Sequence, residues 1–483
     1  MQKVKILLTG ATGSMGKEGL IELYKCKDMY DIVLLARPSE KNIKSLKKYE
    51  NDKSVSIVWG DLTNYNDVLK AVEQVDIVLH VAAFVSPEAD RNPKIAWKIN
   101  YGGTKNIVDA ICSLQKTKDI KLVYIGTVAE TGNRPVPVHW GRVGDPILPS
   151  AYDYYAVSKI AAERLVIESS IKQWVSLRQT GILHHGIMGV DDGIGYHQPI
   201  NNHLEWITSH DSGVLLANVC RNGIPEDFWG NVYNIGGGAA CRATAYEFTT
   251  KLYGLLGVDF KKISEPNWYA LRNFHGQFYL DSDKLNDYLD FRSEGLDDFV
   301  EQMKKKLPFS SKILKFMPLN YVKENVMKKT AMSENSPLYW LEHNIEGKIA
   351  AFFGTKEKWK EIKDWEHFEI IKDPPHIVLD HGYDENKNDS DLDLADVQAA
   401  AKFRGGQCTS VKMNKGDLSA KLEFKCACGH EFEASPKLIL KTGHWCEECS
   451  AAPWRYDEIA KTNPFIAQVY YADHEKNENN IYE

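Results

Sequence analysis

Residues 4–16 read VKILLTGATGSMG, an apolar run that passes directly into three glycines. Gly10, Gly13 and Gly16 have the spacing that lets a buried strand turn sharply into a helix. Because these positions carry no side chains, backbone N–H groups and the positive end of the helix can approach a pyrophosphate. An ordinary turn can use the same glycines. The stretch therefore predicts a strand, a tight turn and a helix, and it favours a dinucleotide site if the rest of the chain agrees.

Short Val, Ile and Leu runs alternate with longer helical patterns from residue 1 to about residue 178. Strands that are buried on both faces give such unbroken apolar runs, and helices between them join parallel neighbours. The pattern predicts an α/β fold with a doubly wound, Rossmann-type parallel sheet, whose ligands bind at the carboxyl ends of the strands. The expected strands are Val4–Leu8, Ile32–Leu35, Val55–Val58, Ile77–Val81, Leu122–Ile125 and Val175–Leu177.

The later parts of the chain lose this alternation and differ from one another in composition. We expect a smaller mixed lobe that binds substrate, then a helical and acidic connector, then a separate module rich in cysteine. The predicted domains are residues 1–178 for the dinucleotide, 179–325 for the substrate lobe, 326–399 for the connector and 400–483 for the terminal module.

The composition excludes several classes of protein. The chain has 483 residues with 26% charged residues and a formal net charge of −7, which gives no overall attraction to nucleic acid or anionic lipid. No run reaches the roughly 18 apolar residues that span a bilayer. Four scattered cysteines are typical of reduced thiols. We therefore expect a cytoplasmic protein without a membrane or nucleic-acid partner, and we leave open whether it forms a homodimer.

Tyr155 and Lys159 are four residues apart in a helical pattern, so both side chains project from one face. A tyrosine with the usual pKa of about 10 is a poor acid or base at neutral pH. A neighbouring ammonium favours the phenolate, and it therefore brings the pKa towards a useful range. The alternative is a surface pair of no catalytic importance.

Across roughly residues 1–325 these motifs resemble the extended short-chain dehydrogenase/reductase superfamily, with its NAD-dependent epimerase/dehydratase-like members. The glycine turn, the Tyr-x-x-x-Lys pair and the hydroxyl of Thr127 at the end of a strand all match. Asn100 matches the structural asparagine of the superfamily. The resemblance implies a catalytic set of Tyr155, Lys159, Thr127 and Asn100, with Tyr155 as general acid or base. It also implies cofactor contacts from Tyr155, Lys159, Gly10, Thr12, Gly13, Ser14, Met15, Gly16, Asp61, Leu62, Ala82 and Ala83.

The end of the second expected strand bears on which dinucleotide binds. NAD-specific proteins carry a carboxylate there that holds the ribose 2′-hydroxyl. This chain has Leu34-Leu35-Ala36-Arg37, without that acid and with an arginine beside its place. The pattern favours the 2′-phosphate of NADP, with NAD as the alternative.

A second group of residues with chemical potential lies near the C-terminus. Cys426 and His430 are followed fifteen residues later by Cys446 and Cys449, and two close ligand pairs across a loop suit a tetrahedral structural zinc. The passage resembles zinc-ribbon modules. Cys408 or Cys428 could replace His430 as fourth ligand, and reduced cysteines without metal are the other interpretation. The glutamates around these positions argue against contact with nucleic-acid phosphates.

The main hypothesis is an NAD(P)-dependent oxidoreductase that acts on a small molecule, reducing a ketone or aldehyde or oxidising the matching alcohol by hydride transfer. The first alternative is a nucleotide-sugar epimerase or dehydratase. Gln179 and Thr180 depart from the Arg-aromatic-x-Asn pattern of sugar-nucleotide members, and we therefore prefer the oxidoreductase. A further alternative is a dinucleotide sensor or scaffold without catalysis, against which the intact Tyr155 and Lys159 argue.

Overall fold

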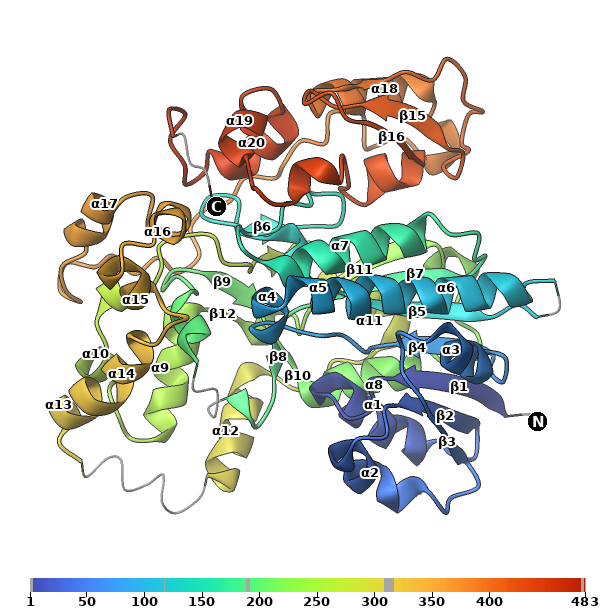
Figure 1. The fold of residues 1–483 in the computed structure, drawn as a ribbon, viewed down its shortest axis with the longest axis horizontal. Coiled ribbons are helices and arrows are strands. Elements are labelled where there is room, and N and C mark those ends of the chain that lie inside the picture. The colour runs from blue at the N-terminus through green and yellow to red at the C-terminus, as the bar shows by residue number, and fades with distance from the viewer. Residues whose placement is uncertain (1–2, 117, 188–191, 308–316, 479–481, 483) are drawn as a thin grey trace.

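A parallel sheet forms the centre of the N-terminal part of the protein (Figure 1). The computed structural model describes residues 3–116, 118–187, 192–307, 317–478 and 482. Within these residues seven parallel strands lie in the order β11-β7-β5-β4-β1-β2-β3. The predicted fold class is confirmed. The strands are β1 (Val4–Thr9), β2 (Tyr30–Ala36), β3 (Val55–Trp59), β4 (Ile77–His80), β5 (Lys121–Thr127), β7 (Trp174–Gln179) and β11 (Asn231–Ile235).

Successive residues of each strand face two different apolar layers, as their period of two requires. Ile6 and Leu8 of β1 pack with one set of helices, and Leu7 between them packs with the other. The first layer contains α1 (Ser14–Lys25), α8 (Ser209–Asn218) and α11 (Ser282–Leu289). The second contains α3 (Tyr65–Val72), α6 (Gly103–Leu114) and α7 (Tyr154–Ile167). The sheet is therefore buried on both faces, which explains its unbroken apolar runs.

The seventh strand comes from the part of the chain that the sequence pattern assigned to a separate lobe. β11 pairs in parallel with β7, and its residues 232–235 are buried. α8 and α11, on either side of it in the chain, cover the same face of the sheet as α1. The chain thus returns to the sheet after its first excursion. A single short strand without a repeated helical neighbour gives no local sign of the sheet that it joins.

The smaller mixed lobe is built from short paired strands and helices. β8 (Ile182–Leu183) pairs with β10 (Ile207–Thr208), and β9 (His203–Glu205) pairs with β12 (Arg242–Thr244). Its helices include α9 (Ala245–Leu255), α10 (Phe260–Ile263) and α12 (Leu296–Lys306). Further short helices pack on this lobe, namely α13 (Leu319–Val322), α14 (Lys328–Ala331), α15 (Pro337–Glu342), α16 (Glu346–Phe353) and α17 (Lys356–Glu361).

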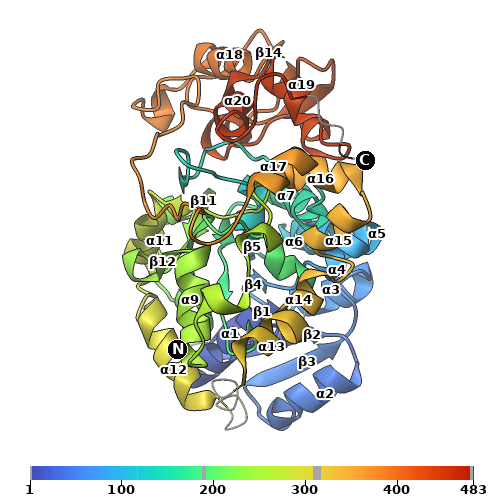
Figure 2. The same cartoon turned by 90° about the vertical axis from the view of Figure 1, so that its left-hand side faces the viewer.

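The C-terminal module lies over α7, where Figure 1 and Figure 2 both show it in orange and red. It begins with α18 (Leu394–Phe403) and contains a three-stranded antiparallel sheet of β14 (Gln407–Cys408), β15 (Leu422–Lys425) and β16 (Glu431–Ala434). Helices α19 (Tyr456–Ala460) and α20 (Pro464–Tyr470) follow. Throughout the described ranges, no helix has the length and apolar character that crossing a bilayer requires.

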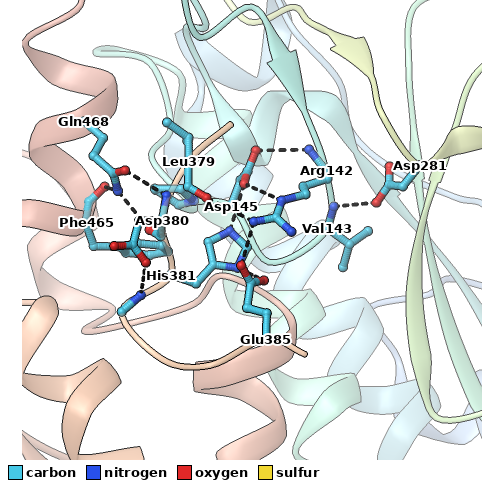
Figure 3. A network of polar contacts seen from close by, with 12 residues as sticks. Arg142, Val143, Asp145, Asp281, Leu379, Asp380, His381, Glu385, Phe465 and Gln468 are labelled. Atoms are coloured by element: carbon cyan, nitrogen blue, oxygen red, sulfur yellow. Dashed lines mark hydrogen bonds and ion pairs between the residues drawn. The ribbon is translucent and has the colours of Figure 1, made fainter. Parts of the chain in front are cut away.

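A buried histidine, His381, joins the segment before α18 to the loop that precedes α7 (Figure 3). His381 is 1% exposed, and its two ring nitrogens lie 2.9 Å from Asp145 Oδ1 and 2.6 Å from Glu385 Oε1. Arg142 donates to Glu385 over 2.8 Å and to the carbonyl oxygen of Leu379 over 3.0 Å. Burial lowers the pKa of His381, but the hydrogen bonds and charges of the two carboxylates outweigh this effect and raise it above 6.5.

Stability is therefore expected to fall as the pH rises through the folded pKa of His381. A pKa that is higher in the folded state contributes stability fully below the unfolded value and loses it above the folded one. We expect His381→Gln to lower the free energy of unfolding by about 2 kcal/mol at pH 6 and to flatten its decline towards pH 9. Urea titrations measure both quantities. His367→Gln, which changes an exposed histidine beside Asp364, is the control. An unchanged pH slope in His381→Gln would contradict this account.

Candidate active site

The glycine turn lies at the carboxyl edge of the sheet, between β1 and β4, where the strand order reverses. Gly10 has a φ of +74°, and a Cβ there would lie 2.8 Å from the backbone of Ala82. A Cβ on Gly16 would lie 2.2 Å from the carbonyl oxygen of Gly10. Larger residues cannot replace these two glycines without moving the backbone. The turn consequently presents the N–H groups of the first turn of α1 to the space above the sheet.

A cleft of about 880 Å³ runs along this edge of the sheet. Tyr155 and Thr127 line one end of it, and residues after β2 line the other. Lys159 and Asn100 do not line it. The predicted dinucleotide contacts that line the cleft are Gly10, Thr12, Gly13, Ser14, Met15, Gly16, Arg37, Asp61, Leu62, Ala82 and Ala83. The structure thus brings most of the predicted residues to one continuous surface that has room for an extended dinucleotide.

The end of the cleft beside β2 carries positive charge. Arg37, Ser39 and Lys41 line it, and Arg37 and Lys41 are exposed. In the part of the chain that the structure describes, neither of these two cations forms an ion pair. The Thr12 hydroxyl donates to Asn42 Oδ1 over 2.9 Å, and Asn42 Nδ2 donates to the Arg37 carbonyl over 3.0 Å, so the glycine turn and the loop after β2 hold each other in place.

Tyr155 belongs to the first turn of α7. The Asp153 carboxylate caps this helix by accepting from the N–H of Ala156 over 2.7 Å, and Asp90 accepts from the N–H of Tyr155 over 3.1 Å. The Tyr155 side chain is hydrogen-bonded to Thr127. Burial raises the pKa of Tyr155 well above its usual 10, and the bond to Thr127 only partly offsets this. The phenol is therefore neutral at pH 7 and places an O–H group at the end of the cleft.

Lys159 lies one turn further along α7 and is 2% exposed. Its Nζ donates to the carbonyl oxygen of Ile125 over 2.7 Å and lies 4.1 Å from the centre of the Tyr124 ring. Burial lowers the pKa of Lys159 to about 8, while Glu130 and Glu163 favour the charged form. The expected lowering of the tyrosine pKa is not seen, because burial and nearby carboxylates dominate and the ammonium is bonded to a backbone carbonyl.

Asn100 holds the loop after β4 against α7. It lies in the helical segment η2 (Trp97–Gly102), and its amide accepts from the N–H of Phe84 over 2.7 Å and donates to the carbonyl of the same residue over 2.9 Å. Its Nδ2 also donates to Ser158 Oγ over 2.9 Å. These bonds fix the position of the loop that contains Ala82 and Ala83. Asn100 is therefore a positioning residue.

A smaller chamber of about 210 Å³ adjoins the Tyr155 end of the cleft and shares Phe274 and His275 with it. Lys348, from α16, projects into this chamber and lies 3.6 Å from the centre of the Tyr152 ring. Burial lowers its pKa to about 8, with a partial offset from Asp90. Burial and then Asp153 raise the pKa of Asp90 to about 6. The chamber therefore offers donors, acceptors and aromatic faces together.

Sequence reasoning missed Lys348 and Asp90. Asp90 follows the carboxyl end of β4, which is a position where ligands of such sheets bind. Lys348 gave no signal, because a lysine in a short amphipathic helix is usually solvated. Several aromatic residues and histidines contribute to these cavities, because Tyr152, His197 and His275 line the chamber and His184 lines the cleft. Trp140, His185, Trp206 and Trp268 instead pack against other side chains.

Residues 6–178 match the model of the NAD dependent epimerase/dehydratase family. We refer to this matched part of the chain as the epimerase/dehydratase domain. The chain is 28% identical over 164 residues to human sterol-4-alpha-carboxylate 3-dehydrogenase, decarboxylating, which is 33% of this chain and 41% of that protein. It is 27% identical over 168 residues to an uncharacterized epimerase/dehydratase of Staphylococcus aureus, strain USA300, covering 33% and 47%. The chain thus matches less than half the length of either relative.

The fold of the epimerase/dehydratase domain is also found in a solved structure. UDP-glucuronic acid 4-epimerase from Bacillus cereus, solved with UDP-glucuronic acid and NAD, superposes with a TM-score of 0.50 and 20% identity. The superposition covers 63% of this chain and 100% of that one. The likeness concerns the fold, and it leaves over a third of this chain outside.

The predicted metal ligands form a cluster outside the epimerase/dehydratase domain. The ligand atoms of Cys426, His430, Cys446 and Cys449 all lie within 4.8 Å of one another. His430 Nδ1 is 3.5 Å, 3.3 Å and 3.6 Å from the sulfurs of Cys426, Cys446 and Cys449, and the sulfurs of Cys426 and Cys449 are 3.8 Å apart. Of the alternative ligands, Cys428 is exposed and Cys408 is buried, and both are outside this group.

These separations fit a tetrahedral metal. Zinc bonds of about 2.3 Å to sulfur and 2.0 Å to nitrogen, at tetrahedral angles, separate two sulfurs by about 3.8 Å and sulfur from nitrogen by about 3.6 Å. The second ring nitrogen of His430 lies 3.6 Å from Glu448 Oε2, where a carboxylate can orient the ring. The cluster can therefore hold one zinc ion with a closed set of four ligands, which is the arrangement of a structural site.

Proposed function

We propose that the protein is an NAD(P)-dependent enzyme of the epimerase/dehydratase type that oxidises a secondary hydroxyl of its substrate by hydride transfer. The observation that carries the proposal is the pair of hydroxyls of Tyr155 and Thr127 at the end of the cleft whose other end begins at the glycine turn. A pure sensor or scaffold has no use for this pair. The family match supports an epimerase or dehydratase over the oxidoreductase, acting on a ketone, an aldehyde or the matching alcohol, that the sequence alone favours.

Four residues have different roles in the proposed reaction. A bound nicotinamide would accept or donate the hydride. Tyr155 moves the proton at the substrate oxygen, and Thr127 holds the same oxygen through a hydrogen bond. Lys159 supplies a positive charge behind them, next to the ribose position that the family resemblance implies. Asn100 keeps the loop after β4 in place, so that the cofactor surface and α7 hold a fixed distance.

The adjoining chamber supports a hydroxyl-rich substrate. Lys348 and the carboxylates of Asp90 and Asp153 provide charges of both signs, and Tyr152 and Phe274 provide aromatic faces. Such a lining can bond several hydroxyls on one ring and contact its apolar face. A nucleotide-linked sugar has this chemistry. The second candidate is a secondary alcohol such as a sterol, favoured by the similarity of the N-terminal part to a sterol dehydrogenase.

Product analysis distinguishes these candidates. The purified protein is incubated with NADP or NAD and a panel of nucleotide-linked hexoses and sterol alcohols. An epimerase or dehydratase gives a changed sugar with no net reduction of the dinucleotide, whereas a dehydrogenase gives reduced dinucleotide and ketone in equal amounts. Dinucleotide binding without conversion of any member of the panel would support the sensor instead.

We further propose NADP as the preferred dinucleotide, because Arg37, Ser39 and Lys41 together present donors at the ribose end of the cleft. NAD remains the alternative, and NAD is the dinucleotide in the Bacillus cereus structure.

Arg37→Ala is expected to weaken NADP binding about 10-fold to 100-fold and to leave NAD binding almost unchanged, because only NADP carries the phosphate that the guanidinium bonds. Fluorescence titrations with both dinucleotides measure this difference. Lys44→Ala, which removes an exposed charge of α2 (Glu40–Leu46) that does not line the cleft, is the matched control. Equal losses of affinity for NADP and NAD would show that Arg37 does not discriminate between the two dinucleotides.

For the cluster of Cys426, His430, Cys446 and Cys449 we propose one structural zinc ion. The match between its interatomic distances and tetrahedral geometry supports this assignment. The metal would stabilise the C-terminal module and take no direct part in hydride transfer.

A further inference from the structure

A short segment of the C-terminal module, residues 442–446, reaches into the epimerase/dehydratase domain. The carbonyl oxygen of Thr442 accepts from Arg178 Nη2 over 2.9 Å, and His444 Nε2 lies 2.8 Å from Glu163 Oε2. Because Glu163 is an ionised carboxylate, held so by Arg178 and His444, the histidine must donate this bond. His444 is 2% exposed, and Glu163 and Arg178 are fully buried.

The same segment is anchored by its backbone on both sides of His444. The carbonyl of Gly443 accepts from the N–H of Ile147 over 3.1 Å, and the carbonyl of Trp445 accepts from Arg164 Nη1 over 2.8 Å. Gly443 has a φ of +80°, and a Cβ there would lie 1.9 Å from the carbonyl oxygen of Asp145. Only glycine permits this approach. Cys446, which follows Trp445, belongs to the Cys/His cluster. Consecutive residues, 444–446, therefore connect the cluster with the catalytic helix α7.

A series of polar contacts connects His444 with Thr127, whose hydroxyl lines the cleft. Glu163 lies one helical turn after Lys159 on α7, and it accepts from Arg178 Nε over 3.1 Å. That same Nε lies 3.3 Å from Glu130 Oε2. The other oxygen of Glu130 accepts from the N–H of Thr127 over 3.0 Å and so fixes the backbone that carries the cleft hydroxyl. We call this buried chain of polar groups the relay; it begins at His444 in the module and ends at Thr127, the proposed substrate contact.

Two of the same groups, Glu130 and Glu163, also act on the charge of Lys159. Glu130 and Glu163 both favour its charged form against the effect of burial. The Tyr124 ring faces its ammonium, and Tyr124 itself donates to the carbonyl of Lys159 over 3.2 Å. Any change that removes the charge of Glu163 consequently removes one of the two interactions that favour the charged form of Lys159.

We propose that His444 is a positioning residue for the reaction, which acts through Glu163 and Arg178 on Thr127 and Lys159. The C-terminal module is then a working part of the active site, although none of its described residues lines the cleft or the chamber. This inference rests on the proposed function of Tyr155, Thr127 and Lys159, and the experiments below separate the two.

The first test compares His444→Leu with His444→Gln in the full-length protein. Leucine removes the donor to Glu163, whereas the amide of glutamine can restore it. We expect His444→Leu to lower kcat by about tenfold or more with KM and dinucleotide affinity unchanged, and His444→Gln to recover most of the loss. His343→Leu, at an exposed histidine, is the control. Equal kcat values for His444→Leu and His343→Leu would overturn the proposal.

The zinc content of each variant is measured, so that loss of the metal is not mistaken for loss of the relay. If His444→Leu loses zinc, Glu163→Gln is used instead to test the proposal, because this substitution changes no residue of the module. Lys159 then loses a carboxylate that favours its ammonium, and we expect the alkaline limit of activity to move down by about one pH unit. An unchanged kcat and pH profile in Glu163→Gln would overturn the proposal.

Hydrogen exchange provides a readout that needs no substrate. In His444→Leu we expect faster exchange in residues 124–131, at the end of β5, and unchanged exchange in β1 and α1. Unchanged exchange in residues 124–131 would contradict the relay. If His444→Leu shows faster exchange there but the wild-type protein converts no substrate, the relay is supported and the proposed function is refuted.

Discussion

Replacing Tyr155 by phenylalanine is expected to lower turnover by roughly 10² to 10⁴, the usual contribution of a general acid or base. The phenyl ring keeps its packing in the first turn of α7, and the glycine turn is untouched. Dinucleotide affinity should therefore remain that of wild type. Steady-state kinetics together with fluorescence titration of the dinucleotide measure both properties on the same preparation.

Tyr288→Phe is the matched control, because the Tyr288 hydroxyl bonds Asp227 on the far side of the sheet and lines neither cavity. It should leave turnover unchanged. Near-normal turnover in Tyr155→Phe would remove the tyrosine from the mechanism. A loss of dinucleotide binding equal to the loss of turnover would show that Tyr155 binds the cofactor and does not move the proton.

Removing the proposed metal is expected to unfold the C-terminal module. Zinc binding in small structural sites contributes about 10–16 kcal/mol, which is as large as the whole stability of a typical domain. Cys446→Ser should therefore lose the metal and expose the core around Trp445 and Phe424, and a strong chelator should do the same to the wild type. Elemental analysis and limited proteolysis of residues 400–478 follow the two effects.

Cys428→Ser is the control, because Cys428 lies between two ligands in the sequence but is exposed and outside the cluster. It should bind one metal ion per chain. Metal-free wild-type protein from a reducing preparation without chelator would contradict the zinc site. A Cys446→Ser protein that keeps a folded module would show that the cluster is not required for its stability.

Local patterns in the sequence were sufficient for the fold class and for most of the cleft. The apolar run before Gly10 predicts β1, and the spacing of the three glycines follows from contacts within a few residues. β11 could not be assigned to the sheet in this way, because a five-residue strand shows its partner only through long-range pairing with β7. The place of Tyr155 in the cleft was predictable from its spacing to Lys159, because that spacing is a local property of α7.

Features that depend on distant contacts were not predictable. The ammonium of Lys159 bonds the carbonyl of Ile125, a choice that depends on how α7 packs on β5. His444 and Glu163 are 281 positions apart, and neither position carries a motif. Lys348 enters the chamber from a helix outside the matched family region. The proximity of Cys426, His430, Cys446 and Cys449 was predictable because two short spacings restrict their geometry, whereas the exclusion of Cys408 and Cys428 from the cluster required the structure.

The most direct test of the central claim is a single turnover with substrate that carries deuterium on the carbon bearing the hydroxyl. Enzyme with bound dinucleotide is mixed with less than one equivalent of this substrate, quenched, and the nicotinamide is analysed by mass spectrometry. In samples quenched before the turnover is complete, we expect deuterium on the nicotinamide in wild type and almost none in Tyr155→Phe over the same time. Conversion of the substrate in which the deuterium is lost to the solvent and at no time appears on the nicotinamide would contradict hydride transfer as the function of this cleft.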